Sequence, residues 1–205
     1  MFMKKLLAIL LTLFLFSSVY ATVNSVKIQQ KVNIHQQWQT LHQQVVMLYE
    51  QGVYREAVEH AIKSLQFARE NIGEKHPNTA SSLNTLAFIY HTFGDYQKAE
   101  PLYRSALSIR IDTLGENHLD VARTQTNLAL LTNHLRRFNE AELLYKRALI
   151  SVEQNLGLFH ADVAVILENL SLLYKDTNRQ QLSNKLHRRV FEIRVMQEKN
   201  KKEKL

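Results

Sequence analysis

The chain contains no cysteine, and among its 205 residues it has only two prolines and five glycines. Without cysteine it can form no disulfide, no thiolate metal site and no cysteine nucleophile. Proline and glycine are the residues that most destabilise a helix interior, so their scarcity favours a mostly helical chain. Apolar residues make up 45% of the sequence, which is enough for a continuous core, and stability must come from packing.

Residues 1–21 follow the three-part layout of a secretory signal peptide. Lys4 and Lys5 give a positive start, and the apolar run after them is shorter than the roughly 20 residues needed to span a bilayer. Val19 and Ala21 then place small residues before a cleavage point. We expect cleavage after Ala21 and a protein that is periplasmic or secreted. The alternative is an uncleaved N-terminal anchor, which is the only membrane contact expected.

Two segments lie outside the main pattern of the chain. Residues 22–34 are mostly polar with isolated Val and Ile, and we expect a linker or flexible segment there. Residues 198–205 are rich in lysine and are interpreted as a loose, solvated basic tail. The formal net charge of +7 is spread along the chain. The pattern argues against nucleic acid as a partner, because no aromatic residues interleave with the charges and no nucleic-acid-binding motif appears.

A pattern of small and aromatic residues recurs at a spacing of 42 residues, so that Tyr103 returns as Tyr145 and Ala106 as Ala148. A fixed period of this length indicates stacked helical units. An alanine at a helix crossing lets two backbones approach closely, and an aromatic ring one turn away fills the wider space beside it. The units are expected at residues 35–77, 78–119, 120–160 and 161–197.

The fourth unit has lost much of the pattern. Ser183 stands where the third unit has Ala141, and His187 stands where it has Tyr145. The second helix of this unit is rich in Lys, Arg and Gln. A terminal repeat has no neighbour to cover it, so its outer face must be polar. We interpret the fourth unit as a capping pair of helices.

The second and third units share a motif carried by Leu86, Ala87, Gly94, Tyr96, Ala99, Glu100, Pro101, Tyr103, Ala106, Leu107, Asn127, Leu128, Ala129, Phe138, Ala141, Glu142, Tyr145, Ala148 and Leu149. This motif resembles the tetratricopeptide repeat, and more narrowly the 42-residue form of kinesin light chains and their bacterial relatives. The resemblance covers roughly residues 38–197. It implies an all-α, right-handed superhelical solenoid of about four helix pairs, the last of them a degenerate cap.

The same resemblance implies a concave groove that is lined by the first helix of each pair and that holds a peptide or a partner helix. An asparagine in such a groove can hold a peptide backbone, since its amide both donates and accepts hydrogen bonds. The alternative is that the asparagines cap or bridge helices within the protein. The candidate groove residues are Asn84, Thr85, His91, Arg123, Thr126, Asn127, His134, Glu168 and Asn169.

Three histidines, His76, His118 and His160, recur at the repeat spacing. Neighbouring units stack about 10 Å apart, whereas a single metal ion needs its nitrogen ligands within about 2.1 Å. The three therefore cannot share an ion, and we expect each to bond its turn or cap a helix. No catalytic motif is present, so we expect no enzyme activity, no cofactor and no metal site.

The sequence thus predicts an exported, non-catalytic scaffold that binds a peptide or protein partner in its groove. Two alternatives stay open. The chain could be an assembly subunit that self-associates through its repeats. It could also be a basic protein that uses its lysine-rich tail on anionic lipid or nucleic acid, in which case binding would depend steeply on salt.

Overall fold

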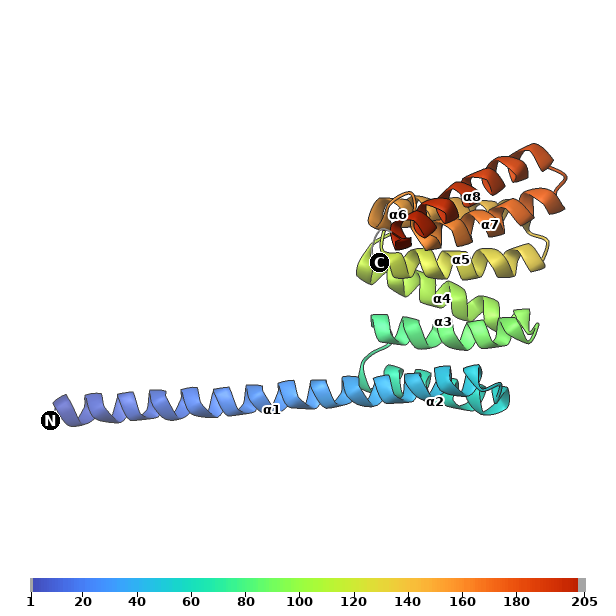
Figure 1. The fold of residues 1–205 in the computed structure, drawn as a ribbon. Coiled ribbons are helices and arrows are strands. Elements are labelled where there is room, and N and C mark those ends of the chain that lie inside the picture. The colour runs from blue at the N-terminus through green and yellow to red at the C-terminus, as the bar shows by residue number, and fades with distance from the viewer. Residues whose placement is uncertain (1, 203–205) are drawn as a thin grey trace.

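The computed structural model describes the backbone of residues 2–202 and the side chains of residues 20 and 23–202. Over this range all regular structure is helical, and it forms eight helices (Figure 1). They are α1 (Phe2–Glu50), α2 (Tyr54–Asn71), α3 (Pro77–Thr92), α4 (Tyr96–Leu114), α5 (Leu119–His134), α6 (Phe138–Leu156), α7 (Ala161–Asp176) and α8 (Gln180–Lys202).

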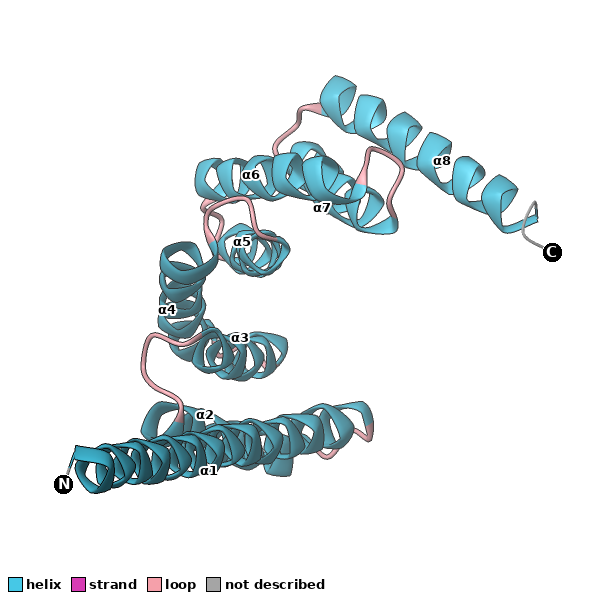
Figure 2. Cartoon of the chain, turned by 90° about the vertical axis from the view of Figure 1, so that its left-hand side faces the viewer, coloured by secondary structure: helices cyan, strands magenta, loops and turns pink. Residues whose placement is uncertain are grey.

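The helices form four successive pairs, from α1 with α2 to α7 with α8, and the pairs stack along an arc (Figure 2). Helices α3, α5 and α7 lie on the inner side of the arc, while α4 and α6 lie on its outer side. The inner side faces the viewer in Figure 1. The all-α solenoid of helix pairs that the repeat predicted is confirmed.

The repeating alanines and tyrosines form the core between pairs. Tyr103 and Ala106 of α4 are fully buried, and so are Tyr145 and Ala148 of α6. These small side chains let the helices of one pair approach those of the next, and the tyrosine rings fill the space left beside them. The repeat spacing in the sequence is therefore the spacing of packed layers in the fold.

The turn inside each pair holds one residue in the left-handed region of backbone space. The four residues stand 42 positions apart and are Gly52 (φ 76°), Gly94 (φ 76°), Arg136 (φ 60°) and Asn178 (φ 58°). Glycine adopts this conformation without a steric penalty, whereas an ordinary side chain does not. The last two pairs therefore have the same turn geometry without a glycine.

Residues 22–34 are not the linker or flexible segment that the sequence predicted, because they continue α1 as a helix, whose side chains from residue 23 on are mostly exposed. No glycine or proline interrupts the sequence of α1. A helix that is already formed extends one residue at a time without a new nucleation cost. The expected amphipathic period is missing because most of the described side chains of this part of α1 are exposed to water.

The predicted loose tail is also wrong up to Lys202, since α8 remains helical to that residue. Residues 203–205 lie outside the described residues. The side chains of residues 1–19, 21 and 22 also lie outside them, so the signal peptide and its cleavage after Ala21 stay predictions. No helix among the described residues is long and apolar enough to cross a membrane.

Candidate functional site

The three recurrent histidines begin the inner helices. The Nδ1 atoms of His76, His118 and His160 each accept a hydrogen bond from the backbone N–H two residues later, at 3.1, 3.1 and 3.2 Å. Each side chain thereby satisfies one of the N–H groups that a helix N-terminus leaves unpaired. The prediction that these histidines cap helices is confirmed.

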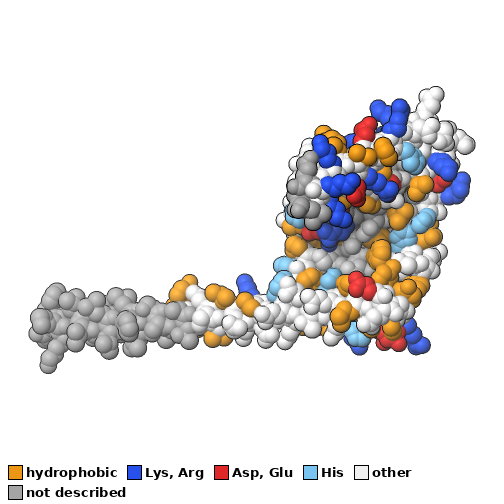
Figure 3. Space-filling model, in the orientation of Figure 1, with side chains coloured by type: hydrophobic (Ala, Val, Ile, Leu, Met, Phe, Trp, Pro, Cys, Tyr) orange, Lys and Arg blue, Asp and Glu red, His pale blue; other side chains and the backbone are white. Residues whose placement is uncertain are grey.

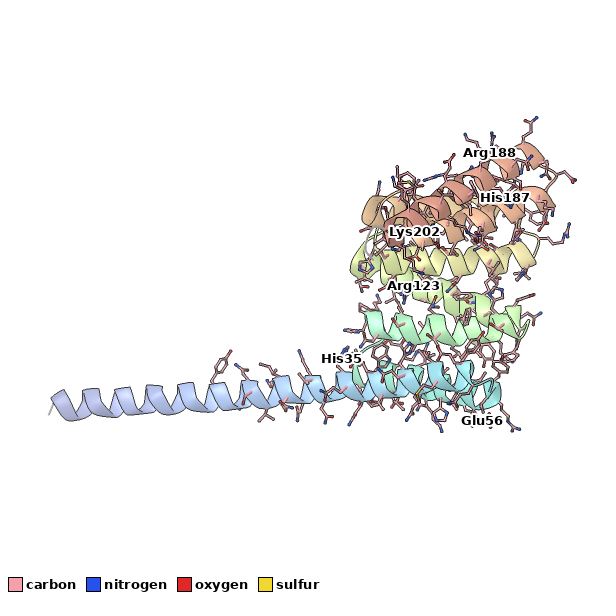
Figure 4. The ribbon with its side chains drawn as sticks, viewed as in Figure 1. His35, Glu56, Arg123, His187, Arg188 and Lys202 are labelled. Atoms are coloured by element: carbon pink, nitrogen blue, oxygen red, sulfur yellow. The ribbon has the colours of Figure 1, made fainter. Side chains whose placement is uncertain are left out.

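A hollow of 270 Å³ lies between α5 and α7 on the inner side of the arc. Three of the predicted groove residues, Arg123, Thr126 and Asn127, meet there. Arg123 is exposed, and its Nη1 lies 3.5 Å from an oxygen of Asp120 (Figure 4). Apolar and charged side chains thus share the lining, which consists of Leu119, Ala122, Arg123, Thr126, Asn127, Val152, Asp162, Val165 and Ile166.

The asparagines of the inner helices divide into two kinds. The Nδ2 of Asn127 donates to Oδ1 of the buried Asn84 at 3.3 Å, which links α5 to α3. These two asparagines therefore bridge two helices within the protein, and Asn84 is buried rather than open to a ligand. Asn169 makes no side-chain hydrogen bond within the part of the chain that the structure describes. Asn127 also lines the hollow, and its Oδ1 is a hydrogen-bond acceptor that a ligand could use.

His91 and His134 are both predicted groove residues, and they bind each other. His91 Nε2 lies 2.9 Å from His134 Nδ1, and the ring of Tyr96 stacks on His134. Burial, and secondly the neighbouring His134, lower the pKa of His91 to about 4. His91 is therefore uncharged at neutral pH, and the pair joins α3 to α5.

Other predicted groove residues have partners of their own. Glu168 forms an ion pair with Arg194 of α8. The hydroxyl of Thr126 donates to the carbonyl of Ala122 at 2.9 Å. Thr85 Oγ1 lies 3.4 Å from His42 Nε2. Of the nine candidates, Arg123, Asn127 and Asn169 are best placed to meet a ligand.

Sequence reasoning missed Arg110, a buried cation at the centre of the solenoid. Its guanidinium donates to Thr124 Oγ1 at 2.6 Å, to the carbonyl of Asp120 at 3.0 Å and to Ser81 Oγ at 3.1 Å. Burial lowers the pKa of Arg110. The sequence could have indicated this residue, because a charged arginine stands at a repeat position that the apolar Val152 occupies one unit later.

The described residues contain no cluster of three or more His, Cys, Asp or Glu side chains that could hold a metal ion. The polar groups of the inner side are spread along three helices and pair mostly with one another. What the arrangement offers chemically is a set of amide, guanidinium and apolar contacts along a curved surface. Such a surface can contact another protein chain.

Two solved structures share this fold. The crystal structure of BtubC (BKLC) from P. vanneervenii has a TM-score of 0.69 and 27% sequence identity, over 77% of this chain and 62% of that one. This chain thus spans less than two thirds of that relative. A Podosopora anserina protein, described as having nearly identical kinesin light chain TPR-like repeats, has a TM-score of 0.66 and 21% identity over 79% of this chain and 76% of that one. No curated protein matches.

A family model described as a tetratricopeptide repeat matches residues 39–112, 101–149 and 120–194. These segments cover the stacked helix pairs from α1 to α8. Proteins of this family are in general non-catalytic scaffolds for protein–protein interaction. The chain belongs to the tetratricopeptide repeat family.

Proposed function

We propose that this protein is an exported scaffold that holds a peptide or a protein segment on the inner side of its arc. The observation that carries the proposal is the hollow between α5 and α7, where Arg123 and Asn127 border an apolar floor. An apolar side chain of a ligand would enter the hollow. The amide of Asn127 would bond its backbone, and Arg123 would meet a carboxylate.

The charge of the surroundings supports a ligand with acidic groups. Arg110 of α4 bonds Asp120 and Thr124 of α5, one of the two helices that border the hollow, and the chain as a whole is basic. Asp120 and Asp162 lie close to the hollow and limit that preference, so the apolar contact remains a main source of affinity. A mixed ligand, with an apolar anchor beside a carboxylate, fits the lining best.

An affinity pull-down from envelope and secreted fractions tests the groove. The bait is the purified protein, compared with the double variant Arg123→Ala, Asn127→Ala. A matched control makes the same two changes on the exposed side of α6, as Arg147→Ala with Asn139→Ala. We expect a partner that binds the wild type and the control but is lost with the groove variant. Equal capture by all three baits would show that the partner binds elsewhere, and capture of the protein alone would favour self-association.

Export is proposed from the layout of residues 1–21, and it has its own test. The secreted and envelope fractions of an expressing cell should contain a mature form that begins at Thr22. Replacing Val19 and Ala21 by arginine should block cleavage and retain the longer form. N-terminal sequencing and intact mass distinguish the two, and an unprocessed wild-type chain in the cytoplasm would contradict the proposal.

A further inference from the structure

The last helix pair of the described residues, α7 with α8, has an open face. Between α7 and α8 lies a hollow of 460 Å³ lined by Glu168, Leu172, His187, Val190, Phe191 and Arg194. Phe191 is 69% exposed and Leu172 is 51% exposed. A large aromatic side chain this exposed beside other apolar residues is typical of an interaction surface. The polar outer face expected of the capping pair therefore does not extend over this hollow.

The equivalent surface of the preceding pair, α5 with α6, is covered by α7. One unit earlier, 42 residues back, Val190 corresponds to Ala148 and Phe191 corresponds to Leu149. Ala148 is fully buried, and Leu149 packs against the same core that holds the buried residues of α7. Helix α5 packs in the same way on the pair α3 and α4. The surface between two helices of a pair thus receives a further helix at each internal step, and no described residue after α8 covers that surface on the last pair.

Helix α1 of a second copy is a poor occupant. It carries Gln37, Thr40 and Gln44, all exposed, at the positions where α7 faces the preceding pair. Stacking these side chains on the apolar hollow would remove polar groups from water without partners, which costs free energy. The corresponding residues of α7 are apolar and buried, and they are Val163, Ile166 and Leu170.

Charge argues against a second copy of α8 and for an acidic partner. Helix α8 carries seven Lys and Arg against two Glu. Lys and Arg side chains gather over the end of the body where α8 lies (Figure 3). His187 and Arg188 lie side by side on α8, with Lys202 toward its far end (Figure 4). Two such helices would repel each other, whereas a negatively charged helix would be attracted.

We propose that the open face between α7 and α8 binds an acidic amphipathic helix of another protein. The apolar stripe of that helix lies on Leu172, Val190 and Phe191, with anchors spaced three and four residues apart. Its carboxylates lie toward Arg188 and Lys202. This end face is separate from the hollow between α5 and α7, so the protein offers two different binding surfaces.

The probe for the test comes from the protein itself. Helix α7, with the sequence ADVAVILENLSLLYKD, packs on the equivalent face one unit earlier. A fluorescent synthetic peptide of this sequence, with Val165→Glu and Leu172→Glu in the peptide, is an acidic amphipathic helix. An uncharged counterpart carries Val165→Lys and Leu172→Lys, so that its three lysines balance its three carboxylates. Fluorescence anisotropy measures the affinity of each for the full-length protein.

We expect micromolar binding of the acidic peptide, weakened by added salt. The protein variant Phe191→Asp should weaken it at least about tenfold, as loss of a central anchor does. Leu182→Asp changes an equally apolar, exposed residue on the opposite side of α8, and it should leave binding unchanged. The variant Arg123→Ala should also bind normally, which separates this surface from the proposed groove.

Three results would overturn the proposal: no binding of the acidic peptide, equal binding by the Phe191→Asp variant, or equal binding of the uncharged peptide. A fourth is a wild-type dimer that Phe191→Asp disperses in sedimentation velocity, because the occupant would then be a second copy. Circular dichroism of both variants checks that they remain folded.

Discussion

Arg136 occupies a turn where two earlier pairs have glycine, and its φ of 60° places it in the left-handed region. This conformation costs an ordinary residue roughly 1–2 kcal/mol, a cost that glycine avoids. Glycine loses about 0.5–1 kcal/mol of this advantage because it has more conformational freedom in the unfolded chain. We expect Arg136→Gly to stabilise the protein by about 0.5 kcal/mol, measured by urea unfolding. Asn178→Gly should gain less, because asparagine tolerates this region. A clear loss with Arg136→Gly would contradict this account.

Gly157, in the linker between α6 and α7, has φ 89° and ψ 161°. This region of backbone space is essentially restricted to glycine, and other residues pay about 1–3 kcal/mol there. A Cβ at this position would meet no atom within 4 Å. Gly157→Ala and Gly157→Leu should therefore destabilise the protein by the same amount in thermal unfolding. A much larger loss with leucine would show that a clash, rather than backbone strain, sets the cost.

At the scale of helices, the pair His91 and His134 joins α3 to α5 and should make stability depend on pH. The pKa of His91 is lowered from 6.5 to about 4 in the folded protein, first by burial. Below pH 6.5 the unfolded chain therefore binds a proton that the folded protein does not bind. The stabilisation is complete above pH 6.5 and is lost as the pH falls toward 4, by about 2–3 kcal/mol.

The measurement is the free energy of unfolding between pH 4 and 7.5, for the wild type and for His91→Gln. The difference between the two curves isolates His91 from the other titrating groups. The variant should lose stability at pH 7.5 and show a shallower fall toward acid. Parallel curves would mean that His91 titrates alike in the folded and unfolded chains.

The helix pairs could be predicted because one period carries both the core alanines and the capping histidines, such as His118. Interactions between units could not be predicted in the same way. The bond between Asn84 and Asn127 depends on the distance between neighbouring inner helices, which the sequence does not contain. The helical state of residues 22–34 was missed because a helix that is mostly exposed needs no apolar stripe. The left-handed turn at Arg136 was missed because no glycine marks it.

At the scale of the whole molecule, the first and the last described helix pairs differ. The exposed glutamines and threonine on α1 keep it from stacking on the open face of another copy. We expect the triple variant Gln37→Val, Thr40→Ile, Gln44→Leu to form head-to-tail oligomers. A contact of this kind joins two different surfaces and does not close on itself, so the oligomers should grow with concentration.

Sedimentation velocity over a range of concentrations measures this growth. The matched control makes the same types of change on a neighbouring side of α1, as Gln36→Val, Gln39→Ile and Gln43→Leu. Oligomers formed by the control as well would show that added apolar surface alone causes association. Adding Phe191→Asp to the triple variant should return it to the wild-type mass.

The helical state of residues 22–34 has a mechanical consequence. At 1.5 Å per residue these thirteen residues form a rod of about 20 Å, continuous with the part of α1 that packs in the body (Figure 1). A label attached at residue 22 should therefore keep a fixed distance from one on the repeat body, as paired spin labels would report. Residues 22–34 therefore act as a rigid spacer. A group attached at residue 22 is held away from the inner surface and cannot fold back over it.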